Sequence, residues 1–175
     1  MVNASANLTK SNLFSQSFAN LFNLINSKTN VPDPVFTNSK RTMVYSREPD
    51  ILNLQSEGYP FIIIKPADIS TEQYSLDAGS SRFNFSFMLE IRCTDRVRGK
   101  EGKGNYSIGI QYVDQLTDSI IKTLNDKTNR MVLNAYGQGT FIIDTESIDT
   151  DEIEGEPVWI RRIRLTSKER LKGGI

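Results

Sequence analysis

The chain has 175 residues, the size of one ordinary domain, and we expect a single domain over residues 1–175. It holds 21 Lys and Arg against 21 Asp and Glu, so it lacks the charge excess of a dedicated nucleic-acid or membrane-surface binder. The absence of histidine excludes His-based catalytic triads and His metal ligands, and the single cysteine, Cys93, excludes intrachain disulfides and cysteine-cluster metal sites. Composition therefore argues against an enzyme, and we expect no catalytic residues, no cofactor and no metal.

The first predicted element is an amphipathic helix over residues 11–27, where Leu, Phe and Ile recur every three or four residues. Pro32 and Pro34 cannot continue this helix, because proline lacks the backbone amide. The stripe of phenylalanines on the helix is typical of core packing, with docking on a neighbouring subunit as the alternative. Residues 40–46 follow as a short strand and residues 47–58 as a loop.

Two strands and a glycine-rich loop come next. Residues 59–65 are β-branched and aromatic and predict a largely buried strand, and residues 83–92 alternate apolar and polar side chains, which predicts a long strand with one apolar face. The two strands suit a hairpin. Residues 95–104 contain three glycines and four basic residues without any periodicity, so we expect a mobile loop.

A second amphipathic helix is predicted over residues 107–126, and strands are predicted over residues 140–144 and 157–166. Residues 146–156 fit an extension of the first of these strands and a turn, and the basic tail at residues 167–175 is expected to fray. The order of elements predicts an α+β fold in which an antiparallel β-sheet packs with two amphipathic α-helices. The longest uninterrupted aliphatic or aromatic run is only Phe61–Ile64, so we expect neither a secretory signal nor a membrane span.

Each candidate chemical motif in the sequence lacks a residue that its chemistry requires. Asn105 and Tyr106 follow Gly104, where a phosphate-binding loop requires Lys and then Ser or Thr. Ile153 stands where a calcium loop begun at Asp149 requires Asp or Asn. Cys93 has no histidine to activate it and is interpreted as a structural thiol.

Charge is separated along the C-terminal part of the chain. Residues 144–156 hold seven acids and no base, whereas residues 157–175 hold six basic residues and one acid. Two hypotheses explain this separation: the charges pair across strands within one subunit, or they join neighbouring subunits head to tail in a ring. The alternation places Arg162 and Arg164 on the face opposite Trp159, Ile163 and Leu165, which we assign to the core.

The order of elements resembles the tail-terminator proteins of long-tailed bacteriophages, the family that includes the lambdoid minor tail protein U. The points of similarity are the N-terminal amphipathic helix, the strand that begins at Tyr59-Pro60, the long alternating strand, the second helix, and a closing hairpin with an acidic turn and Trp159. The chain has extra residues at about 42–58 and 95–104 relative to small members of that family.

The resemblance implies a virion structural protein, assembled in the host cytoplasm, that caps the tail tube as a ring, commonly a homohexamer. Its expected partners are the tail tube protein and a head or neck connector protein, with DNA passing through the lumen without sequence-specific binding and no membrane contact. The alternative is a head-completion or neck connector protein, and a small carboxylate-based enzyme or binding module is a further one. We predict a subunit or partner interface that contains Arg96, Arg98, Lys100, Lys103, Asp149, Asp151, Glu152, Glu154, Arg162 and Arg164.

Overall fold

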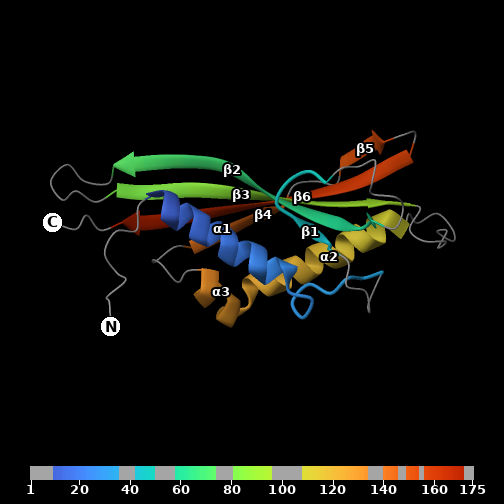
Figure 1. Ribbon diagram of the computed structural model, residues 1–175, viewed down its shortest axis with the longest axis horizontal. Coiled ribbons are helices and arrows are strands. Elements are labelled where there is room, and N and C mark those ends of the chain that lie inside the picture. Colours follow the sequence, from blue (N-terminus) through green and yellow to red (C-terminus); the bar gives the residue numbers. More distant parts are fainter. Residues whose placement is uncertain are drawn as a thin grey trace.

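A computed structural model describes residues 10–35, 42–49, 58–73, 81–95, 108–133, 140–145, 149–153 and 156–171. Within these ranges the chain forms α1 (Lys10–Asn26), β1 (Val44–Tyr45), β2 (Phe61–Gln73), β3 (Ser81–Thr94), α2 (Ile108–Asn125), α3 (Lys127–Leu133), β4 (Thr140–Thr145), β5 (Asp149–Ile153) and β6 (Glu156–Leu171). The described strands form one six-stranded sheet in the order β1-β2-β3-β6-β4, and β5 also pairs with β6. The helices lie together against the sheet (Figure 1), which confirms the α+β fold.

The core lies between the helices and one face of β2, β3 and β6. Phe87, Leu89 and Ile91 of β3 are fully buried, and Leu89, the middle one, stands in register with Ile64 of β2 and Ile163 of β6, which are fully buried too. From the helices, Leu21 and Ile25 of α1 and Val113, Leu116 and Ile120 of α2 are buried in the same cluster. The apolar alternation of β3 and the spacing of both amphipathic helices therefore predict this core correctly.

The other side of these three strands points away from α1 and α2, and we call it the far face. Phe61 and Ile63 of β2 lie on it and are fully buried, with the rings of Tyr45 and Tyr59 centred 6.0 and 5.1 Å from that of Phe61. The start of β2, Phe61–Ile64, is thus buried on both faces, as its continuous apolar run predicts. The peptide bond between Tyr59 and Pro60, just before this strand, is cis.

The structure corrects several predicted boundaries. β1 is only two residues long and runs parallel to β2, so the sheet is not wholly antiparallel; the amide of Ile62 donates to the carbonyl of Met43 at 2.8 Å. α3 was not predicted: the carboxylate of Asp126 accepts from the amides of Thr128 and Asn129 at 2.9 and 3.1 Å and starts a new helix. Residues 149–153 form a separate strand, β5, which pairs with the start of β6.

The prediction of a frayed tail is wrong for residues 167–171. The strand β6 continues to Leu171, because β3 supplies partners on one side over Ser81–Phe85, while β4 supplies partners on the other side up to Lys168. Polar side chains gave this stretch the appearance of a tail, but a strand in the middle of a sheet is held by backbone hydrogen bonds whatever its side chains are. Residues 172–175 lie outside the described residues.

Candidate assembly surfaces

Half of the predicted interface residues fall on described backbone. Arg96, Arg98, Lys100, Lys103 and Glu154 lie outside the described residues, as does the predicted mobile loop apart from Asp95. Asp149, Asp151 and Glu152 lie on β5, at the margin of the sheet farther from β2. Arg162 and Arg164 lie on the far face of β6, whereas Ile163 and Leu165 are fully buried on the other face and Trp159 is partly buried there. The predicted division of β6 into a core face and a charged face is confirmed.

The structure does not bring β5 opposite the basic residues of β6. β5 is in register with residues 156–160, which precede Arg161, and only Asp144 of β4 is in register with Arg164. Arg161 instead pairs with Asp114 of α2 at 2.6 Å, and Arg162 lies 3.7 Å from Glu90 of β3. Two basic residues of the strand therefore find carboxylate partners within the subunit that the sequence analysis did not identify.

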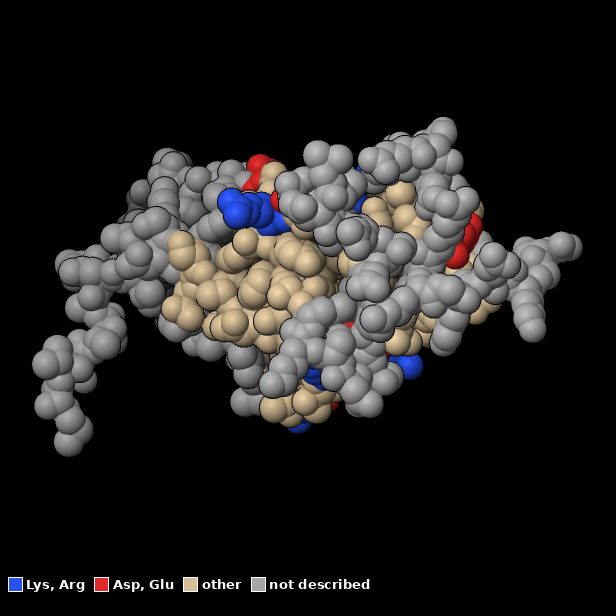
Figure 2. All heavy atoms as spheres, turned by 45° about the vertical axis from the view of Figure 1, so that its right-hand side comes forward, with Lys and Arg blue, Asp and Glu red and all other residues tan. Residues whose placement is uncertain are grey.

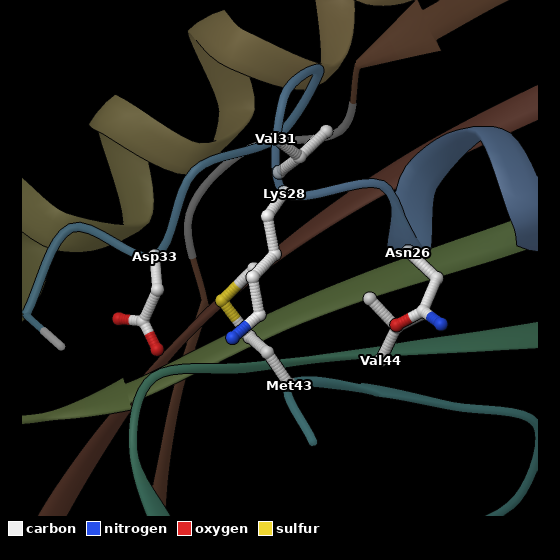
Figure 3. Close-up of a pocket in the computed structure, with 6 residues that line it drawn as sticks. All are labelled: Asn26, Lys28, Val31, Asp33, Met43 and Val44. Carbon is white, nitrogen blue, oxygen red and sulfur yellow. The ribbon is translucent and has the colours of Figure 1, made fainter. Parts of the chain in front are cut away.

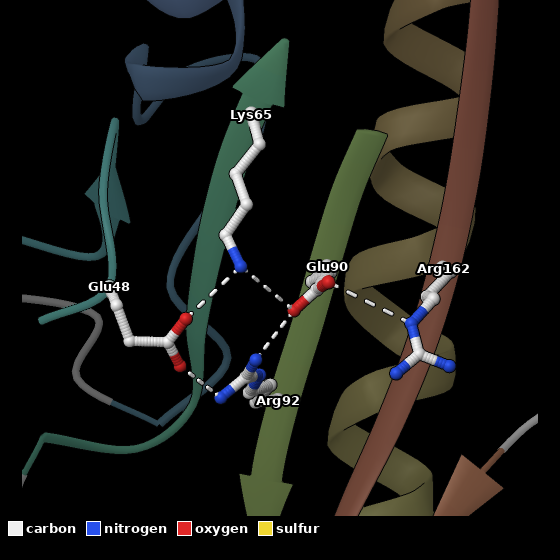
Figure 4. Close-up of polar contacts among 5 residues, drawn as sticks. All are labelled: Glu48, Lys65, Glu90, Arg92 and Arg162. Atoms are coloured by element: carbon white, nitrogen blue, oxygen red, sulfur yellow. Dashed lines mark hydrogen bonds and ion pairs between the residues drawn. The ribbon is translucent and has the colours of Figure 1, made fainter. Parts of the chain in front are cut away.

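Five side chains on the far face form one connected group, which we call the ion cluster: Glu48, Lys65, Glu90, Arg92 and Arg162 (Figure 4). Glu90 sits at its centre, with Arg92 at 2.6 Å, Lys65 at 3.6 Å and Arg162 at 3.7 Å. Glu48 comes from the segment after β1 and joins Lys65, at 3.0 Å, to Arg92. The cluster thus links β2, β3 and β6 to the segment that carries Glu48.

Burial divides the ion cluster into an inner and an outer part. The side chains of Glu90 and Arg92 are 12% and 11% exposed, whereas that of Glu48 is 44% exposed. Partial burial raises the pKa of Glu48, but the bonds and charges of Lys65 and Arg92 outweigh it and leave that pKa below its ordinary value. For Arg92, burial lowers the pKa, while Glu90 and Glu48 raise it to above its ordinary value. Both groups are therefore held in their charged forms.

The outward side of α1 is a second notable surface, because the helix carries no charged residue after Lys10. From Ser11 to Asn26 it contains Ser, Asn, Gln and apolar residues, in a chain whose charged fraction is 24%. Gln16 and Asn23 are exposed, and Phe18 and Phe22 are only partly buried, with ring centroids 6.2 Å apart. Figure 2 shows an uncharged area on one face of the molecule, with charged side chains of both signs at its margins. Few charges and partly exposed aromatic rings are typical of the centre of a protein interface.

Asp95 fixes the start of α2 against β6. Its Oδ1 atom accepts hydrogen bonds from the amide of Gly109 at 3.0 Å and from Nε1 of Trp159 at 3.1 Å. A Cβ atom at position 109 would lie 2.6 Å from Trp159, so glycine is required there by close approach. Asp95, the first residue of the predicted mobile loop, thus connects α2 to β6.

One pocket among the described residues is small. A pocket of about 20 Å³ lies beyond the end of α1, and Asn26, Lys28, Val31, Asp33, Met43 and Val44 line it (Figure 3). This volume suits about one water molecule. Cys93 is buried, as expected of a structural thiol. Among the described residues there is no cluster of His, Cys, Asp and Glu suited to a metal, and no described helix is long and apolar enough to cross a membrane.

Sequence reasoning missed the ion cluster because its members come from distant segments with no common motif. Lys65 and Glu90 come from β2 and β3, and Glu48 comes from a segment interpreted as a loop. One signal was present: within residues 83–92, Glu90 and Arg92 are the charged members of the polar face of a strand whose other face is wholly apolar. Adjacent charges of opposite sign on one strand face indicate pairing along or across the sheet.

Similarity to known proteins is found among solved structures. No protein-family model matches the chain, and no curated protein matches it. Among solved structures, the chain is similar to a chain from the virion of a native gene transfer agent particle, with 12% sequence identity and a TM-score of 0.49. That alignment covers 92% of this chain and 98% of the other.

Proposed function

We propose that the chain is a virion structural protein that caps the phage tail tube as a ring, stops tube polymerisation and forms the joint to the head or neck. The order of elements is the observation that carries this proposal. The helix α1, the strand after Tyr59-Pro60, the long strand β3, the helix α2 and the β5–β6 hairpin with Trp159 follow one another as in the tail-terminator proteins that the sequence resembles. We propose no catalytic role.

Two surfaces support an assembly role. A closed ring of identical subunits uses two different patches on each subunit, one of which meets the other on the next copy. The acidic segment 144–156 and the cationic residues of the far face are such a complementary pair, and β5 and β2 lie toward opposite margins of the sheet. The uncharged outward side of α1 offers a third surface, suited to a neighbouring protein in the virion.

The proposal is tested by the mass and shape of the purified chain, and by its effect on tube growth. We expect light scattering to give a discrete oligomer, commonly a hexamer, and negative-stain images to show rings. Added to polymerising tail tube protein, the rings should shorten the tubes and be found at one end. A chain that remains monomeric at every concentration and salt condition, with tubes of unchanged length, would refute the proposal.

A ring that leaves tube length unchanged but binds a head or neck connector would favour the alternative, a head-completion or neck connector protein. A matched control comes from the charge reversal Asp118→Lys, because Asp118 is exposed on α2 and stands apart from the far face. If the complementary charges join the subunits, this variant should assemble like the natural chain, while reversal of Arg164 should not.

A further inference from the structure

The ion cluster holds an outer carboxylate, Glu48, in a socket built mainly by the strands of the sheet. Lys65 of β2, Arg92 of β3 and Arg162 of β6 surround Glu90, and this inner set carries three positive charges and one negative charge. Glu48 reaches it from outside the three strands and contacts both Lys65 and Arg92 (Figure 4). We call Lys65, Arg92, Arg162 and Glu90 together the socket.

The socket attracts a second carboxylate. Arg92 is 9% exposed, and within the described structure its Nε atom has no hydrogen-bond partner, so its charge depends on carboxylates at its other nitrogens. Lys65 and Arg92 carry two positive charges against the one negative charge of Glu90, and Glu48 balances the second. The exposed Arg164, which lies on the same face of β6 as Arg162, adds a further positive charge. Because Glu90 stays with Arg92, the departure of Glu48 alone does not leave Arg92 without a partner.

Glu48 is held less firmly than the group it completes. Its side chain is 44% exposed, so its ion pairs are screened by water and contribute little, and the released carboxylate would be well hydrated. A segment with several carboxylates can replace the Glu48 carboxylate at small cost, because any of its acids can occupy the position of Glu48 in the socket. The chain contains such a segment at residues 144–156, with seven acids and no base.

We propose that Glu48 is an exchangeable occupant of the socket, and that the acidic segment 144–156 of a second copy of this chain displaces it during assembly. This inference rests on the proposed ring, because it names the contact that joins one subunit to the next. The acidic segment flanks β6 on the side away from β3, and Lys65 lies on β2, beyond β3. The contact is therefore between different patches of the two copies, as in a head-to-tail ring.

The test uses the full chain and a fluorescent peptide of residues 144–156, with binding followed by anisotropy. We expect the peptide to bind at low salt. It should be released at about 1 M salt, where the Debye length falls to a few ångströms and the charges are screened from one another. Glu48→Gln should tighten binding about two- to five-fold because the competitor is lost, and Lys65→Gln should weaken it by a similar factor. Asp118→Asn is the matched control, since it removes the same charge from an exposed position on α2 and should leave binding unchanged.

Three results would overturn the exchange. Glu48→Gln could bind the peptide no better than Asp118→Asn does, which would make the effect one of net charge. A peptide with Asn and Gln in place of its acids could bind equally well, which would exclude carboxylates as the recognised groups. A short DNA duplex could bind more tightly than the peptide and respond more to Glu48→Gln, which would make phosphate the occupant.

Light scattering on the chain without peptide separates this inference from the proposed function. If rings form but Glu48→Gln neither promotes assembly nor tightens peptide binding, the exchange is wrong and the proposed function stands. If no oligomer forms although the peptide binds with the expected dependence on Glu48 and Lys65, the proposed function is wrong while the socket is real. If Glu48 had a purely structural role, Glu48→Gln would weaken assembly. The exchange predicts the opposite, that Glu48→Gln promotes assembly.

Discussion

Replacing Gly109 with alanine tests the contact by which the start of α2 is fixed to β6. The added methyl carbon would lie 2.6 Å from Cδ1 of Trp159, 2.9 Å from Oδ1 of Asp95 and 3.0 Å from the backbone carbon of Thr94. The first two neighbours are side chains that share hydrogen bonds with each other, and the third is backbone, which cannot move alone. The methyl group must therefore displace the helix or break the hydrogen bonds of Asp95.

Three terms decide the size of the effect. Alanine favours a helix over glycine by about 1 kcal/mol, while overpacking costs about 1–3 kcal/mol. Loss of one hydrogen bond to the Asp95 carboxylate costs a further 1.5–3 kcal/mol, roughly. We therefore expect a net loss of about 1.5–5 kcal/mol in the free energy of unfolding, which for a chain of this length lowers Tm by about 3–20 °C.

Urea unfolding can be followed by the fluorescence of Trp159, the one tryptophan in the chain. This signal measures the loss of stability and also reports on the surroundings of the indole side chain at the contact. Gln111→Ala is the control, because it lies exposed on the same helix and changes helix propensity without any clash. A Gly109→Ala chain as stable as the natural one would show that the approach of α2 to β6 is looser than described, and would refute the reasoning.

Three further predictions concern the core and the far face. Phe87→Ala should lower the free energy of unfolding by about 3–5 kcal/mol in urea titrations, because the ring is fully buried and packs 5.8 Å from that of Phe18; a loss below about 1 kcal/mol would contradict this packing. The lowered pKa of Glu48 stabilises the fold above its unfolded value of about 4.3 and is lost as pH falls through the folded pKa, so Glu48→Gln should cost at most about 1 kcal/mol at neutral pH and nothing in strong acid. A cost that grows toward acid would have the wrong sign. Arg164→Glu should lower the oligomer mass in light scattering while the urea midpoint shifts little, because the side chain is exposed; an unchanged mass would exclude Arg164 from the interface.

The elements that were predicted well are those whose own residues show a clear apolar periodicity. The period of α2 and the alternation of β3 each define a buried face, and the helix or strand that results is the one that buries it. The elements predicted poorly depend on neighbours that are distant in sequence. β1 exists because its backbone meets Ile62, and the last residues of β6 are ordered because β3 lies beside them.

The charged surface shows the same division. The placement of Arg162 and Arg164 on one face follows from alternation alone and was predicted. The partner of Arg162 was not, since Glu90 lies on another strand and the register between β3 and β6 is decided by the whole core. One of the two hypotheses from the sequence paired the acidic segment with the basic residues within the subunit, whereas the register places β5 of that segment opposite the start of β6.

The central position of β6 has a consequence for how the chain folds. It is the most C-terminal of the described strands, yet it lies between β3 and β4 and completes the backbone hydrogen bonds of both. While the chain is being synthesised, the edge of β3 that pairs with β6 therefore stays unpaired until β6 has left the ribosome. Unpaired strand edges can pair with other chains. Because most of the sheet depends on contacts between distant parts of the sequence, folding should be slow, and the far face, with strands from both halves of the chain, forms only when folding is complete. A subunit still in synthesis would thus lack the surface through which it joins others.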